Sequence, residues 1–272
     1  MKIFSALTVL VLAHAANAQQ SGDNVLLAGW IHVHAMHTST TLHTDLRPSL
    51  IGQVLGISDS FDSPGTSASL SSIDTLGISS AHFFTDSFSV TFNGGIPSKV
   101  SVRGHGVVAP SGTAGRLFNV DLGDPAVNPL GSARQWSPAV MLQYHFGASV
   151  ARLRPFVGFG FTYTWFTQVK LNPAFERELN MRVGRDLALA AGKPGSTSVS
   201  IDAPPLWEPV FDAGLPFKFG RHWGVTASLA YVPFSTNSIV RIKAADGTVL
   251  STSRPRINVD ALITGLLLSY RF

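Results

Sequence analysis

Segments of about ten residues in which every second side chain is apolar recur along the chain, and they constrain its fold more than any other feature. The clearest spans 157–165, where Val, Phe, Phe, Tyr and Trp alternate with Gly, Gly, Thr and Thr. Similar segments lie near 88–93, 140–146, 211–217 and 225–231. Successive side chains of a strand point to opposite faces, and the second face here carries Gly, Ser and Thr rather than charges. This pattern is typical of strands that cross a lipid bilayer.

The composition agrees with a surface that is partly covered by lipid. Charged residues are only 13% of the chain, against roughly a quarter in a soluble domain. The net charge of +4 is scattered along the chain, which argues against a nucleic-acid-binding face. There is no cysteine, so no disulfide stabilises an exported chain.

The first residues have the layout of a secretory signal peptide. Met1 and Lys2 form a short basic start, an apolar stretch runs from Ile3 to Leu12, and Ala16-Asn17-Ala18 is a small-x-small cleavage site. The sequence predicts removal of residues 1–18 and a single mature domain over 19–272. Beyond the signal, no run of 18 apolar residues predicts a transmembrane helix.

Counting the alternating segments predicts eight strands, and the connections between them alternate in length. The expected strands lie near 25–34, 69–82, 87–97, 135–146, 153–169, 206–217, 223–245 and 248–272. Long connections over about 35–68, 98–134 and 170–205 alternate with the short turns "FFTDS", "GASVAR" and "KFGRH", and a tight turn at Asp246-Gly247 joins the last pair. An even strand number with short periplasmic turns and long extracellular loops indicates an all-β antiparallel barrel in the outer membrane of a Gram-negative bacterium.

Aromatic residues gather near the expected strand ends, as in the girdles of membrane barrels. Trp136, Trp165, Phe166 and Trp207 fall at the outer ends, and Phe83, Phe88, Phe146, Phe217, Trp223, Tyr270 and Phe272 fall at the periplasmic ends.

Two stretches and the C-terminus resemble the OmpW family of eight-stranded outer-membrane barrels. They are "SPAVMLQYHFG" at 137–147, "LRPFVGFGFTYTWF" at 153–166 and the final "SYRF". The motif residues carried over are Arg154, Pro155, Gly158, Gly160 and Tyr163. The long loops depart from the family and carry no motif of it.

The resemblance implies a small monomeric barrel with an apolar interior that passes small hydrophobic molecules through the outer membrane. It also implies that the terminal aromatics, Tyr270 and Phe272, are read by the barrel assembly machinery. We expect neither a cofactor nor a nucleic-acid partner. The expected partners are outer-membrane lipid and lipopolysaccharide.

The last strand allows the interior to be predicted from the residues. If Leu266, Leu268, Tyr270 and Phe272 face lipid, the inward set includes Val259, Ala261, Ile263 and Leu267. Together with Met141 on the fourth strand, these are the predicted lumen residues. The inward Arg271 and Ser269 predict a lumen that is polar near the periplasm and apolar above. Such an interior disfavours a water-filled porin, and eight strands leave room for packed side chains or one small ligand. A filled structural barrel and an adhesive barrel remain alternatives.

The third long connection predicts a helix, with Asn172 as cap, Pro173 in the first position and Gly192 after its end. Phe175, Leu179, Val183 and Leu187 form an apolar stripe along it. We favour a helix packed on the barrel rim over a lid for ligand. Arg177, Arg182 and Arg185 form either a solvated face or a contact to lipopolysaccharide phosphates.

Two further features of the sequence bear on metal and enzyme functions. His32, His34, His37 and His43 lie close together, with His32 and His34 on one face of the first strand, but the spacing fits no zinc motif. Polar residues at the outer rim explain them better than a metal site. A lipid-modifying enzyme with Ser and His at the interface is the less favoured alternative, because the sequence places no such pair within hydrogen-bond reach.

Overall fold

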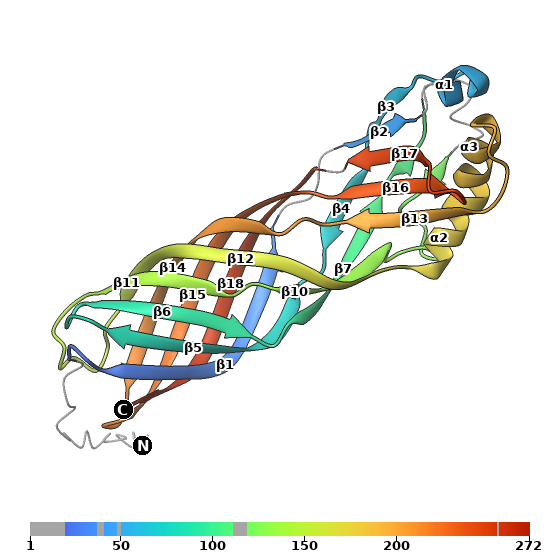
Figure 1. The fold of residues 1–272 in the computed structure, drawn as a ribbon. Coiled ribbons are helices and arrows are strands. Elements are labelled where there is room, and N and C mark those ends of the chain that lie inside the picture. Colours follow the sequence, from blue (N-terminus) through green and yellow to red (C-terminus); the bar gives the residue numbers. More distant parts are fainter. Residues whose placement is uncertain (1–19, 37–40, 48–49, 111–118, 255) are drawn as a thin grey trace, which may run out of the picture.

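The computed structural model describes residues 20–36, 41–47, 50–110, 119–254 and 256–272, and for 234–237 and 256–259 it describes the backbone alone. The predicted signal peptide therefore lies outside the described residues. Figure 1 shows an elongated molecule with the first described residues and the C-terminus at one end and the helices at the other.

Among the described residues, eight long strands close into an antiparallel barrel. Their order is β11-β6-β5-β1-β18-β15-β14-β12, and β12 pairs with β11 to complete the ring. The barrel strands are β1 (Asn24–Ala35), β5 (Ile73–Phe83), β6 (Phe88–Gly95), β11 (Ala139–His145), β12 (Phe156–Leu171), β14 (Leu206–Lys218), β15 (Trp223–Asn237) and β18 (Arg256–Arg271). The predicted eight-stranded fold is thus confirmed, and the predicted short turns join β5 to β6, β11 to β12 and β14 to β15. We call this the periplasmic end, and the opposite end extracellular.

The long connections are folded rather than irregular, and we call them together the extracellular cap. A sheet of order β13-β16-β17-β2-β3 forms one part of the cap, and β4, β7 and β10 continue the barrel sheet from β12. The cap elements are β2 (Leu42–Leu46), α1 (Leu50–Leu55), β3 (Ser60–Ser63), β4 (Ser67–Leu70), β7 (Ser98–His105), β8 (Val107–Val108), β9 (Val120–Asp121), β10 (Gly131–Trp136), α2 (Pro173–Leu179), the π-helical turn η2 (Asn180–Gly184), α3 (Arg185–Ala190), β13 (Thr197–Asp202), β16 (Ile239–Ala244) and β17 (Val249–Arg254).

The cap changes two expectations about the last hairpin. The predicted strand over 223–245 divides into β15 and β16, and the strand over 248–272 divides into β17 and β18. β16 and β17 leave the barrel because they pair with β13 and β2 in the cap sheet. The turn at Asp246-Gly247 spans three residues, since the Ala244 amide donates to the Thr248 carbonyl oxygen.

The expected helix is present and supplies the apolar core of the cap. The Asn172 side chain accepts a hydrogen bond from the Ala174 amide, and Pro173 begins the helix. Phe175 packs in one apolar cluster and Leu187 in another, while Val183 contacts both. Among the described residues, no helix has the length and apolar character to cross a membrane.

Candidate solute pathway

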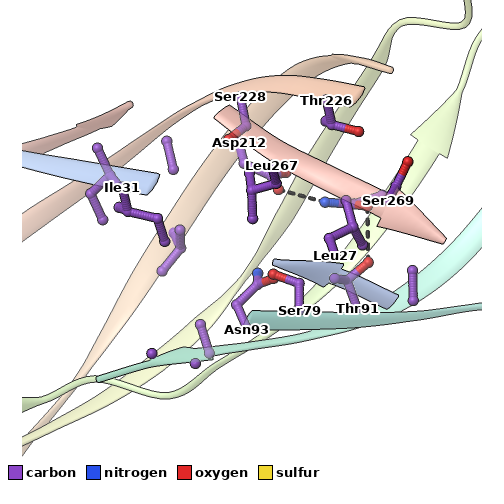
Figure 2. A pocket seen from close by; sticks show the side chains of 18 of the residues that line it. Leu27, Ile31, Ser79, Thr91, Asn93, Asp212, Thr226, Ser228, Leu267 and Ser269 are labelled. Atoms are coloured by element: carbon purple, nitrogen blue, oxygen red, sulfur yellow. Dashed lines mark hydrogen bonds between the residues drawn. The ribbon is translucent and has the colours of Figure 1, made fainter. Parts of the chain in front are cut away.

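The barrel encloses a cavity of about 570 Å³ that receives side chains from all eight of its described strands. This volume falls within the usual range for small-molecule sites. Figure 2 shows Thr226 and Ser228 on one side of the cavity and Ser79 and Asn93 on the other, with Leu27, Ile31 and Leu267 between them. The cavity extends to the turn after β14 and to the wall near Pro97 and Pro138, where β6 ends and β11 begins. Its lining mixes apolar and polar groups.

An apolar layer crosses the middle of the barrel. It consists of Ala139, Met141, Val210, Ala230, Val232, Ala261 and Ile263. Met141 is only 1% exposed. Of the predicted lumen residues, Met141, Ala261 and Ile263 lie in this layer, and Leu267 is buried and lines the cavity nearer the periplasm. Val259 lies in β18, but its side chain is outside the described residues.

A polar network lies directly on the periplasmic side of the apolar layer. The Thr91 hydroxyl donates to Gln143 Oε1 at 2.9 Å, and Gln143 Nε2 donates to Asp212 Oδ2 at 2.6 Å. This region agrees with the expectation of polar groups near the periplasm. No sequence motif singles out these three residues, although alternation with Phe211 puts Asp212 on the opposite face of its strand.

A second acidic group on the extracellular side of the layer corrects the expectation of a wholly apolar upper lumen. Glu208 lies two residues before Val210 on the same face of β14 and is 3% exposed. Its Oε2 accepts a hydrogen bond from Thr164 Oγ1 at 3.1 Å, and Thr164 in turn contacts Ser137 Oγ at 3.0 Å. The interior is therefore apolar in the middle and polar on both sides.

Aromatic side chains line the periplasmic end of the cavity, and a buried arginine lies in the adjoining turn. The rings of Phe83, His145 and Phe156 pack in series with centroid separations of 4.7 and 5.2 Å. Arg154 is fully buried, and its Nη2 donates to the carbonyl oxygens of Asp86 and His145. Arg154 thereby joins the two turns that precede β6 and β12.

A second cavity of about 240 Å³ lies in the cap and is lined mainly by apolar side chains. The whole predicted stripe of Phe175, Leu179, Val183 and Leu187 faces it. Phe166 and Leu70 line it at the barrel rim, and they pack in one apolar cluster with Ala35 and Leu206. The helix is therefore more than a rim element, because its stripe forms a wall of an apolar chamber above the barrel.

A family model described as "OmpW family" matches residues 44–272. The chain belongs to the OmpW family. A curated relative, outer membrane protein AlkL of Ectopseudomonas oleovorans, is 27% identical over 210 residues, which are 77% of this chain and 70% of that protein. The barrel is accordingly an outer-membrane protein.

Two solved structures share the fold of this OmpW family member. The crystal structure of OprG from Pseudomonas aeruginosa has a TM-score of 0.67 at 17% identity and covers 94% of this chain and 98% of that one. The solid-state NMR structure of AlkL in DMPC bilayers has a TM-score of 0.52 at 21% identity and covers 100% of this chain and 96% of that one.

Local contacts explain the residue types at the OmpW motif positions other than Arg154. Pro155 carries the carbonyl that accepts from the Phe146 amide, and Tyr163 packs against Trp207 with tilted rings whose centroids are 4.9 Å apart. A β-carbon at Gly158 would overlap the Asp212 carboxylate, and one at Gly160 would overlap the Val140 carbonyl oxygen. The two glycines thus allow a close approach of neighbouring strands and of an inward acid.

The outer surface of the barrel carries most of the predicted aromatic girdle. Trp136, Trp207, Trp223, Tyr270 and Phe272 are exposed at strand ends. Two predictions for it were wrong: Phe83 is 1% exposed and points inward, and Phe166 lines the cap cavity. Alternation along each strand explains both positions. Phe83 lies on the same face of β5 as the inward Ser79 and Ala81, and Phe166 lies on the same face of β12 as the inward Thr162 and Thr164.

The histidines of the first strand face outward near its extracellular end. His32 Nδ1 lies 2.9 Å from Asp74 Oδ1, which also accepts from Trp30 Nε1, and His34 Nδ1 lies 3.2 Å from Ser72 Oγ. In the described part of the chain, no three His, Asp or Glu side chains form a group suited to a metal ion. His37 lies outside the described residues.

His43 on the outer face of the cap bears on the enzyme alternative. Its Nδ1 lies 2.8 Å from Asp62 Oδ1 and its Nε2 lies 3.1 Å from Ser60 Oγ, the order of contacts in a serine hydrolase triad. Asp45 Oδ1 also lies 3.3 Å from Nε2. The hydrogen bond to Asp62, with the charges of both carboxylates, raises the pKa of His43 and favours the imidazolium, which cannot accept a serine proton.

The same cluster predicts a pH-dependent cap. A raised pKa in the folded state means that His43 contributes stability below about pH 6.5, its usual unfolded pKa, and that this contribution is lost as pH rises through the folded pKa. Because His43 is partly exposed, we expect less than about 1 kcal/mol. Amide hydrogen exchange in β2 and β3, compared at each pH with His43→Gln, measures it. Identical pH profiles of the two proteins would contradict the prediction.

Proposed function

We propose that this OmpW family protein is a channel that passes small hydrophobic molecules across the outer membrane. The observation that carries the proposal is the presence of two mainly apolar cavities in succession, one in the cap and one in the barrel. Transfer of apolar surface out of water is favourable, so an apolar chamber above the membrane attracts such solutes. The family resemblance supports the same function.

The proposed route begins in the cap cavity, passes the apolar cluster at the rim and enters the barrel. Phe166 and Leu70 belong to both the cap cavity and the rim cluster. The apolar layer around Met141 and Ile263 then offers a hydrophobic passage between the two polar regions of the lumen. Hydrated ions and sugars would lose their hydrogen bonds to water in this layer, which gives selectivity for apolar solutes.

Flux into liposomes tests the function directly. An apolar tracer and a hydrophilic solute of similar size are compared in vesicles with and without the refolded protein. Faster entry of the apolar tracer alone supports the channel. If neither solute enters faster than in protein-free vesicles, the barrel is a filled structural element and the proposal fails.

Filling the cap cavity should slow transport without removing any existing contact. Ala203 lines this cavity from the segment between β13 and β14. Ala203→Trp is expected to reduce apolar flux several-fold, because the indole occupies space that the solute needs. Ala126→Trp places the same side chain on an exposed turn and should leave flux unchanged. Equal flux in both variants would show that the cap cavity is not on the route.

A further inference from the structure

Glu208 is a buried acid on the wall of the barrel cavity, and only one of its two carboxylate oxygens has a hydrogen-bond partner among the described residues. Its Oε2 accepts from Thr164, whereas its Oε1 has no hydrogen-bond partner among the described residues. Asp212, four residues further along the same face of β14, repeats the arrangement: Oδ2 accepts from Gln143, and Oδ1 has no described partner.

Neither acid is compensated by a cationic side chain. In the part of the chain that the structure describes, no ion pair includes Glu208 or Asp212. Leaving a buried acceptor without a donor costs free energy, and a carboxylate costs more than a neutral group. A purely hydrophobic conduit does not need an acid at this position. The Glu208 carboxylate is therefore suited to a ligand that donates a hydrogen bond to it.

The apolar layer lies next to Glu208 in a way that suits an amphiphilic molecule. Val210 is two residues away on the same face, about 7 Å along the strand. Val210 packs with Met141 and Val232, and Ala261 and Ile263 pack on the same cluster. A molecule with one charged end at Glu208 would therefore lay a short hydrocarbon part against these side chains.

We propose that Glu208 binds the ammonium group of a short alkylammonium solute, with its alkyl chain on the apolar layer. An ammonium supplies both the charge and the N–H donor that Oε1 lacks, and charge-assisted hydrogen bonds are the strongest of their kind. The proposal rests on the proposed channel function and narrows its solutes from hydrophobic molecules in general to cationic amphiphiles.

Binding to the refolded protein in lipid nanodiscs tests the proposal. Isothermal titration with n-butylammonium, n-butanol and potassium ion, each corrected with empty nanodiscs, separates the headgroup from the chain and from charge alone. We expect n-butylammonium to bind at least about tenfold more tightly than either of the others. Equal binding of n-butylammonium and n-butanol by the unmodified protein would overturn the proposal, and this comparison requires no variant.

Substitutions then locate the site. Glu208→Gln keeps the shape of the side chain but removes its charge, and it should lower n-butylammonium affinity about tenfold while leaving n-butanol unchanged. Glu176→Gln removes the same charge from α2 in the cap and should have no effect. Asp212→Asn should have the smaller effect, because Asp212 is less buried than Glu208 and its Oδ1 lies against Gly158. An unchanged affinity in Glu208→Gln would place the site elsewhere and refute the role of Glu208.

The same preparations separate this proposal from the channel function. Apolar tracer flux through the unmodified protein, together with an ammonium preference that Glu208→Gln abolishes, supports both. Apolar flux without any ammonium preference refutes only the subsite. Ammonium binding at Glu208 without flux of any tracer refutes the channel and leaves a binding site inside a closed barrel.

Discussion

Replacement of Ile263 with aspartate is expected to abolish the flux of an apolar tracer through the reconstituted protein. Ile263 packs on the apolar layer formed with Met141, Val210 and Val232. A carboxylate there has no described partner and retains water, so an apolar solute must cross a hydrated charge. We expect at least a tenfold loss of protein-dependent flux, measured in liposomes with a hydrophilic solute as the second tracer.

The matched control is Ile263→Leu, which conserves volume and apolar character. It should keep most of the flux, and both variants must show the folded barrel by circular dichroism and by heat-dependent migration on gels. If Ile263→Asp folds and passes the apolar tracer at the normal rate, the apolar layer is not the route.

Substitution of Gly160 with valine is expected to prevent folding of the barrel. Gly160 lies in β12 opposite Met141, and any β-carbon there would overlap the carbonyl oxygen of Val140 as well as the Met141 side chain. Because the first obstacle is backbone of the paired strand, rotamer changes cannot relieve it. We expect a loss of about 3 kcal/mol or more, seen as failure to acquire the heat-modifiable folded form in refolding assays.

Gly94→Val provides the control for the loss of a glycine from a barrel strand. Gly94 lies in β6, and a β-carbon there meets nothing within 4 Å. This variant should refold as the unmodified protein does. Equal refolding of Gly160→Val and Gly94→Val would show that the close approach at Gly160 is not required.

The fold of the barrel was largely predictable because its signal is local. Alternation of side chains along one strand fixes which face meets lipid, and it correctly indicated that Leu266, Leu268 and Tyr270 are outward. The helix was predictable for the same reason, since Asn172, Pro173 and the stripe from Phe175 to Leu187 are all within one segment. The family resemblance over 137–166 and the last residues was confirmed by the match over 44–272.

The cap was not predictable, because its sheet joins segments that are far apart in the chain. Thr44 of β2 pairs with Ser253 of β17. Nothing in either short segment indicates the other, and the register depends on the shared core of Leu46, Ile242 and Leu250. The extracellular connections therefore looked like loops in the sequence although they contain an apolar chamber.

The sequence by itself determined the class of the protein: alternating apolar side chains in most of the eight expected strands, with short turns at one end, allow little besides an outer-membrane barrel. Only the tertiary structure decided what the interior contains. Whether Glu208 is paired, and whether Met141 meets Ile263, depends on distances between side chains of different strands. These distances are set by strand register and by closure of the ring, which no single segment encodes.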